Sequence, residues 1–184
     1  MSEVDLVICD AYKGLVQAVR KCFQGAAWQR CQTHFSKNVL DVCPKKLKPE
    51  LHEALRNMYG ADDYKTAVLI RDHIDGRFLE SAPKAVEMLE EGFEDGLAVL
   101  SLPLPLRRRL RTTNGLECVN EELRRRERVI RIFPNDQSLY RLMSALLMES
   151  HEEWQTERMY LNLTEYLAQK AETTDTTAEL SVAS

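Results

Sequence analysis

The stretch that decides the fold is Val4-Asp5-Leu6-Val7-Ile8-Cys9-Asp10, a short apolar run near the start of the chain. It is rich in β-branched residues and ends abruptly at an aspartate, which predicts a buried strand that leads into a helix. Apolar residues then recur at helical spacing as far as Phe23, and Gly25 suits the end of that helix. Residues 26–31 predict a second short strand. The chain therefore begins as an α/β protein.

Beyond this start the pattern is mostly helical. A helix through Phe35 and Leu40 is expected to stop before Pro44. Prolines in first turns and glycines near helix ends then predict three more helices, over residues 49–59, 62–79 and 83–93.

The last third of the chain predicts two long helices. Pro103 and Pro105 indicate an extended connector ahead of them. The first helix ends before residues 132–135, and the second begins near Asp136. The expected apolar faces are Leu116, Val119, Leu123 and Ile130 on the first helix, and Leu139, Leu142, Met143, Leu146 and Leu147 on the second.

Composition describes a globular chain of about one domain, with 184 residues, 44% hydrophobic and 29% charged. The N-terminal residues lack the basic and apolar regions of a signal peptide, and no apolar run is long enough for a membrane span. We therefore expect a cytoplasmic protein. The five cysteines form no C-x-x-C pair, which favours reduced thiols.

The net charge of −4 hides a basic segment. Residues 107–131 hold nine arginines and four glutamates, a local net charge of +5 (nine minus four). A local basic patch matters more for DNA binding than the overall charge. The same segment places one acid, Glu117, beside these bases, which suggests metal-assisted phosphate chemistry.

Asp10 and Glu117 each allow two interpretations. Asp10 follows a predicted strand, where open α/β sheets expose functional groups, but it could also cap the next helix. Glu117 forms a capping-box pattern with Asn114. The nearby Arg124-Arg125-Arg126 run favours function, although Glu121 and Glu122 lie four residues before Arg125 and Arg126 and would also suit a solvated, salt-bridged helix face.

The motif Cys31-Gln32-Thr33-His34 is a C-x-x-H pair. Structural zinc usually needs four ligands in two close pairs, and no clear second pair is present, although Cys43, His52 and His73 occur. The simpler alternative is that Cys31 packs beside the sheet and His34 bonds to backbone. The sequence contains no P-loop, dinucleotide-binding, zincin or serine-hydrolase motif.

Four linked segments resemble the C-terminal half of a Mutator-type bacterial insertion-sequence transposase, with matching order and spacing from about Asp5 to Tyr160. They are Ile8-Cys9-Asp10-Ala11-Tyr12-Lys13-Gly14-Leu15, Gly25-Ala26-Ala27-Trp28-Gln29-Arg30-Cys31-Gln32-Thr33-His34-Phe35, Arg111-Thr112-Thr113-Asn114-Gly115-Leu116-Glu117 with its continuation to Arg126, and Ile132-Phe133-Pro134-Asn135 with Trp154.

The resemblance implies an RNase H-like fold whose mixed sheet carries an Asp, Asp and Glu triad that binds two divalent metals, Mg²⁺ or Mn²⁺. Asp10 matches the second Asp and Glu117 the Glu, so both are implied catalytic metal ligands. Cys31 and His34 match a family signature with a structural or DNA-contacting role. The implied DNA-contacting residues are Arg107, Arg108, Arg109, Arg111, Asn120, Arg124, Arg125 and Arg126.

In these terms the chain is a partial RNase H-like core with a helical insertion. Residues 1–44 would begin the core, 45–100 would form the insertion, 101–168 would complete the core, and 169–184 would be a disordered tail. The implied setting is the bacterial cytoplasm, associated with the nucleoid, with no membrane partner.

The departures from the family pattern concern activity. We expect the chain to lack the first Asp of the triad and the N-terminal DNA-binding region. Asp5 cannot replace the first Asp, because it lies on the same strand as Asp10, whereas the first Asp belongs to a separate, earlier strand. Gly115 replaces a usual proline, and Cys118 and Glu121 replace basic residues. We expect a transposase that cleaves and transfers DNA strands, inactive as an isolated chain. The alternative is a non-enzymatic DNA-binding or oligomerising remnant that forms homo-oligomers or inhibits an intact transposase.

Overall fold

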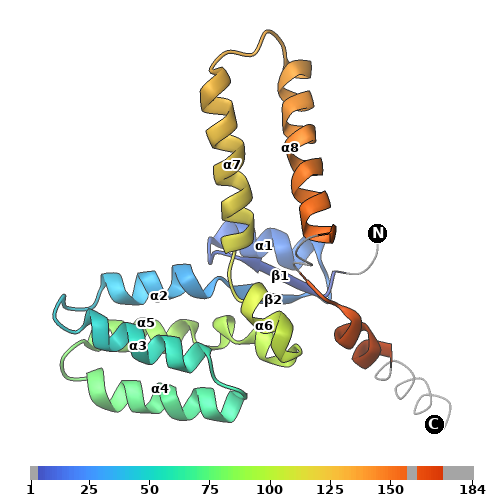
Figure 1. The fold of residues 1–184 in the computed structure, drawn as a ribbon. Coiled ribbons are helices and arrows are strands. Elements are labelled where there is room, and N and C mark those ends of the chain that lie inside the picture. Colours follow the sequence, from blue (N-terminus) through green and yellow to red (C-terminus); the bar gives the residue numbers. More distant parts are fainter. Residues whose placement is uncertain (1–3, 157–160, 172–184) are drawn as a thin grey trace. The chain divides into compact units, whose positions relative to one another are not determined.

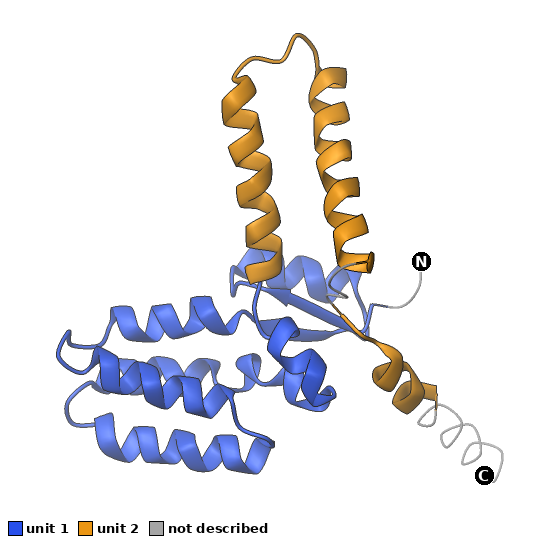
Figure 2. Cartoon of the chain, in the orientation of Figure 1, with its two compact units in different colours: residues 1–113 blue, residues 114–184 orange. Residues whose placement is uncertain are grey.

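The computed structural model describes residues 4–156 and 161–171 (Figure 1). The chain divides into two compact units, residues 1–113 and 114–184 (Figure 2). The boundary lies inside the segment 101–168 that the sequence suggested as the second part of the core. A small parallel sheet and many helices make up the described residues, so the prediction of a mostly helical α/β chain is confirmed.

The first unit begins with a strand, a helix and a second strand. They are β1 (Leu6–Cys9), α1 (Lys13–Cys22) and β2 (Ala27–Arg30). The strands pair in parallel, with Leu6 opposite Ala27 and Cys9 opposite Arg30. Gly25 adopts a φ of 91°, a left-handed conformation that glycine reaches without steric cost, in the turn after α1. Since parallel strands end at the same edge, the residues that follow Cys9 and Arg30 emerge side by side.

Helices form the rest of this unit. They are α2 (Gln32–Asp41), α3 (Lys48–Tyr59), α4 (Tyr64–Phe78), α5 (Pro83–Gly92), the short 3₁₀ turns η1 (Glu94–Gly96) and η2 (Ala98–Ser101), and α6 (Leu104–Leu110). Phe35, Leu55, Met58, Phe78 and Leu89 from α2 to α5 are fully buried in one core. The four longer helices lie within a few residues of their predicted positions, because their prolines, caps and apolar spacing are local signals.

The expected extended connector at Pro103 and Pro105 is wrong. Pro103 is the residue before α6, and Pro105 lies in its first turn. A proline there loses no helical hydrogen bond, because the first amide groups of a helix have no partner within it. Leu106 is buried and anchors the helix to the unit.

A buried glutamine joins the sheet to the end of the helical segment. Gln29 on β2 has no exposed surface. Its Nε2 donates to the carbonyl oxygen of Gly96 at 2.8 Å, and its Oε1 accepts from the backbone N–H of Val99 at 3.0 Å. The Nε2 of Gln32 donates to the same Gly96 oxygen at 2.8 Å. These bonds hold η1 and η2 against β2.

The second unit contains two long helices, α7 (Asn114–Ile130) and α8 (Asp136–Thr156). They run in opposite directions and are joined by residues 131–135, as predicted (Figure 1). A further helical stretch spans residues 164–171, so the first three residues of the expected disordered tail are helical. The remainder of that tail lies outside the described residues.

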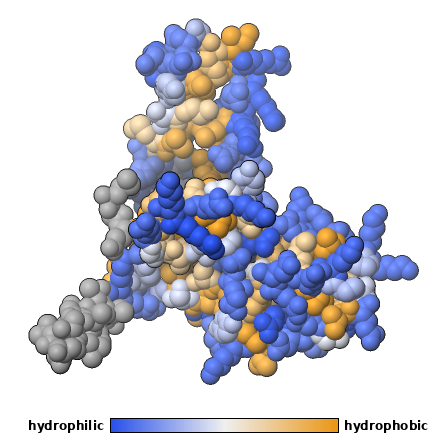
Figure 3. Space-filling model, turned by 180° about the vertical axis from the view of Figure 1, so that it is seen from behind, coloured by the Kyte–Doolittle hydropathy of each residue, from blue (hydrophilic) through white to orange (hydrophobic). Residues whose placement is uncertain are grey.

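The expected apolar faces of these two helices are only partly covered. Within α7, which the structure describes completely, no residue is buried, and Leu116 is 62% exposed. On α8 Leu146 is buried, whereas Leu147 is 48% exposed. Both hydrophobic and hydrophilic residues lie on the visible surface of this helical pair (Figure 3). Among the described helices, none is long and apolar enough to cross a membrane.

We predict that Gly92→Ala destabilises the chain by about 1–3 kcal/mol, the typical cost of overpacking a core. A Cβ atom at Gly92 would lie 2.5 Å from Cζ of the fully buried Phe35 and 2.6 Å from an Nη1 atom of Arg30. Arg30 already stacks on the Phe35 ring, 4.0 Å from its centroid, so neither group can move away freely.

The matched control is Gly76→Ala on α4, where an added Cβ meets nothing within 4 Å. We expect this variant to be neutral or more stable by about 0.5–1 kcal/mol, because alanine loses less entropy than glycine in a helix. Urea unfolding followed by circular dichroism measures both changes. Equal stabilities for the two variants would contradict the close packing around Gly92.

Candidate functional site

Asp10 directly follows β1 at the carboxyl edge of the sheet, and its side chain is 51% exposed. The capping alternative does not apply, because α1 begins only at Lys13 and the residue before it, Tyr12, occupies the cap position. Asp10 therefore presents a carboxylate at the end of a strand without serving the next helix. This is the position where open α/β sheets place functional groups.

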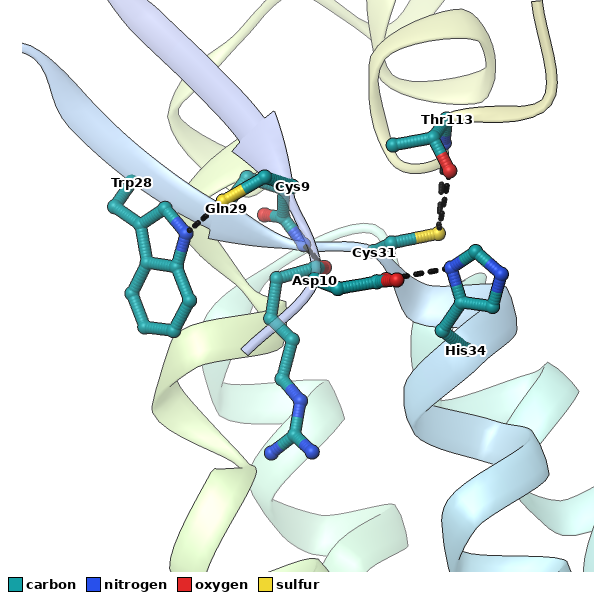
Figure 4. A network of polar contacts seen from close by, with 8 residues as sticks. Cys9, Asp10, Trp28, Gln29, Cys31, His34 and Thr113 are labelled. Carbon is teal, nitrogen blue, oxygen red and sulfur yellow. Dashed lines mark hydrogen bonds and ion pairs between the residues drawn. The ribbon is translucent and has the colours of Figure 1, made fainter. Parts of the chain in front are cut away.

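The C-x-x-H motif lies at the same edge of the sheet. Cys31 directly follows β2, is fully buried, and donates its backbone N–H to the carbonyl of Cys9 at 3.0 Å. His34 lies three residues later in the first turn of α2, so its ring and the Cys31 sulfur share one helix face. The Nδ1 atom of His34 is 2.5 Å from Oδ1 of Asp10 (Figure 4).

Three different ligand types therefore meet at this edge. One ligand atom each from Asp10, Cys31 and His34 lies within 4.8 Å of the other two. The Cys31 sulfur also accepts hydrogen bonds from the backbone N–H and the hydroxyl of Thr113, both at 3.4 Å. We did not predict this cluster from the sequence, although two predicted strands, each with a residue type that binds metals at or directly after its end, were a usable signal.

Glu117 lies in the first turn of α7 and is partly buried. It belongs to the second unit, whereas Asp10 belongs to the first. Asn120, one turn further along α7, is also partly buried. The joint action of Asp10 and Glu117 at one metal site stays a prediction.

Comparison with known proteins decides the family. Residues 1–157 match the model of the family described as "Transposase, Mutator family". The chain belongs to the Mutator family of transposases. It is similar to the transposase for insertion sequence element IS256 in transposon Tn4001 of Staphylococcus aureus, with 42% identity over 164 residues, which cover 86% of this chain and 41% of the relative.

Two further relatives are covered to a similar extent. The transposase for element ISRM5 of Rhizobium meliloti is 39% identical over 87% of this chain and 40% of its own length. The transposase for element IS1081 of Mycobacterium tuberculosis is 36% identical over 89% of this chain and 39% of its own length. The chain thus spans about two fifths of the length of these curated relatives.

The arginines of α6 in this Mutator-family chain divide by environment. The guanidinium of Arg107 donates to the backbone carbonyls of Leu102 at 2.7 Å and Asp62 at 2.6 Å, which gives it a structural role within the first unit. Arg108 and Arg109 are exposed. Arg111, the residue that follows α6, is partly buried, and its carbonyl accepts the backbone N–H of Gln32 at 3.0 Å.

The arginines of α7 divide in a similar way. The carboxylate of Glu122 binds both Arg125 and Arg126, with closest nitrogen–oxygen distances of 2.7 Å. This pairing is the salt-bridged helix face that the sequence left open, although one glutamate serves both arginines. Arg124, the third arginine of the run, is exposed. DNA contacts of these arginines and of Asn120 stay predictions.

We predict that the pKa of Glu122 is about 2, because hydrogen bonds from Arg125 and Arg126 stabilise its charged form. Because the pKa is lowered in the folded chain, these pairs stabilise α7 at pH values above the ordinary glutamate pKa of 4.5. This stabilisation is lost as the pH falls toward 2. Carboxyl carbon shifts measured by NMR during an acid titration report this pKa.

The control is the double variant Arg125→Gln/Arg126→Gln, which removes both guanidinium groups and keeps the carboxylate. In it the pKa of Glu122 should return toward the ordinary glutamate value. An unchanged titration midpoint would show that the two arginines are not the cause.

Proposed function

We propose that this chain carries part of the catalytic site of an insertion-sequence transposase, which cleaves DNA strands and transfers them during transposition. Asp10 and Glu117 would be catalytic metal ligands, with Mg²⁺ or Mn²⁺ as the cofactor. The observation that carries the proposal is the exposed carboxylate of Asp10 at the carboxyl edge of a parallel strand pair, in a chain of the Mutator family.

The residues at this edge fit a divalent ion. Mg²⁺ is typically held by one or two carboxylates, with water and substrate phosphates as the other ligands. The half-exposed Asp10 offers one such carboxylate, and Glu117 in the first turn of α7 would offer the second. A bound metal pair would activate the attacking oxygen and stabilise the leaving oxygen of a displacement at phosphorus.

The chain's own residues have separate parts in this proposal. His34 contacts Asp10 and holds its carboxylate in one orientation at the strand end. Exposed arginines such as Arg108 and Arg124 would bind DNA phosphates, which position the duplex without reading its sequence. The β1–α1–β2 start would belong to an RNase H-like core, with residues 45–100 as its helical insertion. The protein would act on transposon ends and target DNA at the bacterial nucleoid in the cytoplasm.

The first test is nicking of supercoiled plasmid by the purified chain in Mg²⁺ or Mn²⁺. Under the enzymatic proposal nicking requires the metal and is lost in Asp10→Asn and in Glu117→Gln, because each replaces a charged ligand by a neutral one of similar size. Loss should be at least about 100-fold, the scale expected for removing a group that stabilises the transition state. Gel electrophoresis of relaxed and supercoiled plasmid measures the rate.

Glu121→Gln is the matched control, because it removes the same charge from an exposed position one turn further along α7. It should nick at the wild-type rate. Nicking that survives in both Asp10→Asn and Glu117→Gln would rule out the assigned ligands. DNA binding without any nicking is the result expected for an inactive isolated chain, and would assign this chain the second function below.

The second candidate function is a non-enzymatic DNA-binding or oligomerising protein that associates with an intact transposase. The exposed apolar side chains of the second unit favour it, because uncovered apolar surface is typical of association sites. These side chains are Leu116, Val129, Ile130, Ile132, Tyr140, Leu147 and Met148.

Both candidates predict DNA binding that weakens with salt. Arg108→Gln and Arg124→Gln should each lower the slope of log K against log salt by about 0.9, the value for one phosphate contact. Arg107→Gln is the control, since its guanidinium binds backbone carbonyls, and it should lower stability rather than the slope. Fluorescence anisotropy with labelled duplex DNA measures the slopes. A slope that neither exposed arginine changes would remove both from the DNA interface.

A further inference from the structure

We propose that Asp10, Cys31 and His34 form a binding site for one thiophilic transition-metal ion of the Zn²⁺ class. Their ligand atoms lie within 4.8 Å of one another, at the edge where β1 and β2 end. This site goes beyond the proposed DNA chemistry, in which Asp10 is the only one of these three residues that binds a metal.

The donor set selects the kind of ion. A thiolate, an imidazole and a carboxylate are the three ligand types that bind Zn²⁺ in proteins, whereas Mg²⁺ prefers oxygen ligands and binds sulfur poorly. Three protein ligands leave a fourth tetrahedral position open for water, as in catalytic zinc sites. Since the side chains of Asp10 and His34 are 51% and 38% exposed, ions from solution can reach them.

The backbone already places the ligands for this geometry. Ligand atoms around a tetrahedral zinc ion are separated by about 3.3–3.7 Å, which follows from bond lengths of about 2.0–2.3 Å. Asp10 and His34 are now 2.5 Å apart in direct contact, so small side-chain rotations would open a place for the ion between them. The bond from Cys31 N–H to the Cys9 carbonyl fixes the two strand ends, and α2 fixes the spacing from Cys31 to His34.

The surroundings of the sulfur also suit a metal ligand. The Cys31 sulfur is an acceptor toward both the N–H and the hydroxyl of Thr113, and donors of this kind stabilise negative charge on a ligand sulfur. Cys31 is fully buried, so its orientation is set by packing. Zn²⁺ at this site would occupy Asp10 and exclude Mg²⁺ from it, a consequence that rests on the proposed function.

Cobalt(II) is the probe for this site, because thiolate bonded to Co²⁺ gives a charge-transfer absorption band. The Cys22→Ser/Cys118→Ser double variant, which lacks the two exposed cysteines, is the background protein. We expect one equivalent of Co²⁺ to produce the band, Zn²⁺ to remove it, and the same concentration of Mg²⁺ to leave it unchanged. Thr113→Val should weaken Co²⁺ binding by about tenfold, the lower end of the cost of losing a supporting contact.

Ligand variants decide the assignment. Cys31→Ser should abolish the band, and His34→Gln and Asp10→Asn should each weaken Co²⁺ binding by more than about 100-fold, more than a supporting contact contributes. Cys31 is buried, so Cys31→Ser could fail to fold. His34 and Asp10 are more exposed, so their variants should fold and keep the test decisive. Circular dichroism checks the folding of all three variants. Absence of the band in the folded background protein, or its persistence at full strength in His34→Gln and Asp10→Asn, would overturn the proposal.

Glu117→Gln separates this site from the proposed function. The variant removes an acid assigned to DNA cleavage and leaves all three proposed Co²⁺ ligands in place, so its Co²⁺ band should be unchanged. A normal band in a chain that does not nick DNA would support the transition-metal site even if the catalytic proposal failed. A band lost in Glu117→Gln would contradict a site made by Asp10, Cys31 and His34.

Discussion

The buried amide of Gln29 is the interaction on which the first unit depends. Its oxygen and nitrogen bond backbone groups of Val99 and Gly96, which are 70 and 67 residues away in the sequence. A buried amide without such partners would cost roughly 1–3 kcal/mol per unpaired group. The helical segment must therefore return to β2 after α5, and it does so through η1 and η2. The position of α6 and of Thr113 follows from that return.

Cys31, two residues after Gln29 and directly after β2, belongs to the proposed metal site. Parallel pairing brings the ends of β1 and β2 together, so an oxygen ligand and a sulfur ligand from different parts of the sequence become neighbours. A carboxylate alone would favour hard ions, and the adjacent sulfur and imidazole shift that preference toward softer ones. In the two proposals, this edge would join two kinds of metal chemistry at one residue, Asp10.

Local signals explain what the sequence predicted well. The β-branched run of β1, the prolines and caps of α3 to α5, and the break at residues 131–135 each act within a few residues. The contact of His34 with Asp10 could not be read in this way, because it depends on strand pairing and register. The structural role of Arg107 was missed for a similar reason, since its carbonyl partner at Asp62 is 45 residues away. The preference of proline for the first turn of a helix could have predicted α6, but Pro103 and Pro105 were interpreted as signs of an extended connector.

The contacts of Cys31 and Gln32 with the end of the first unit have a consequence for how such chains can vary. Cys31 binds Thr113, 82 residues later, and the N–H of Gln32 binds the carbonyl of Arg111. The helical segment from α2 to α6 lies between these contacts, so hydrogen bonds hold its two ends together beside the sheet. The entropic cost of closing a loop rises only slowly with its length. Residues can therefore be inserted or deleted at the exposed turns of this helical segment at little thermodynamic cost. The helical part can therefore change in length while Asp10 and Cys31 keep their positions at the edge of the sheet.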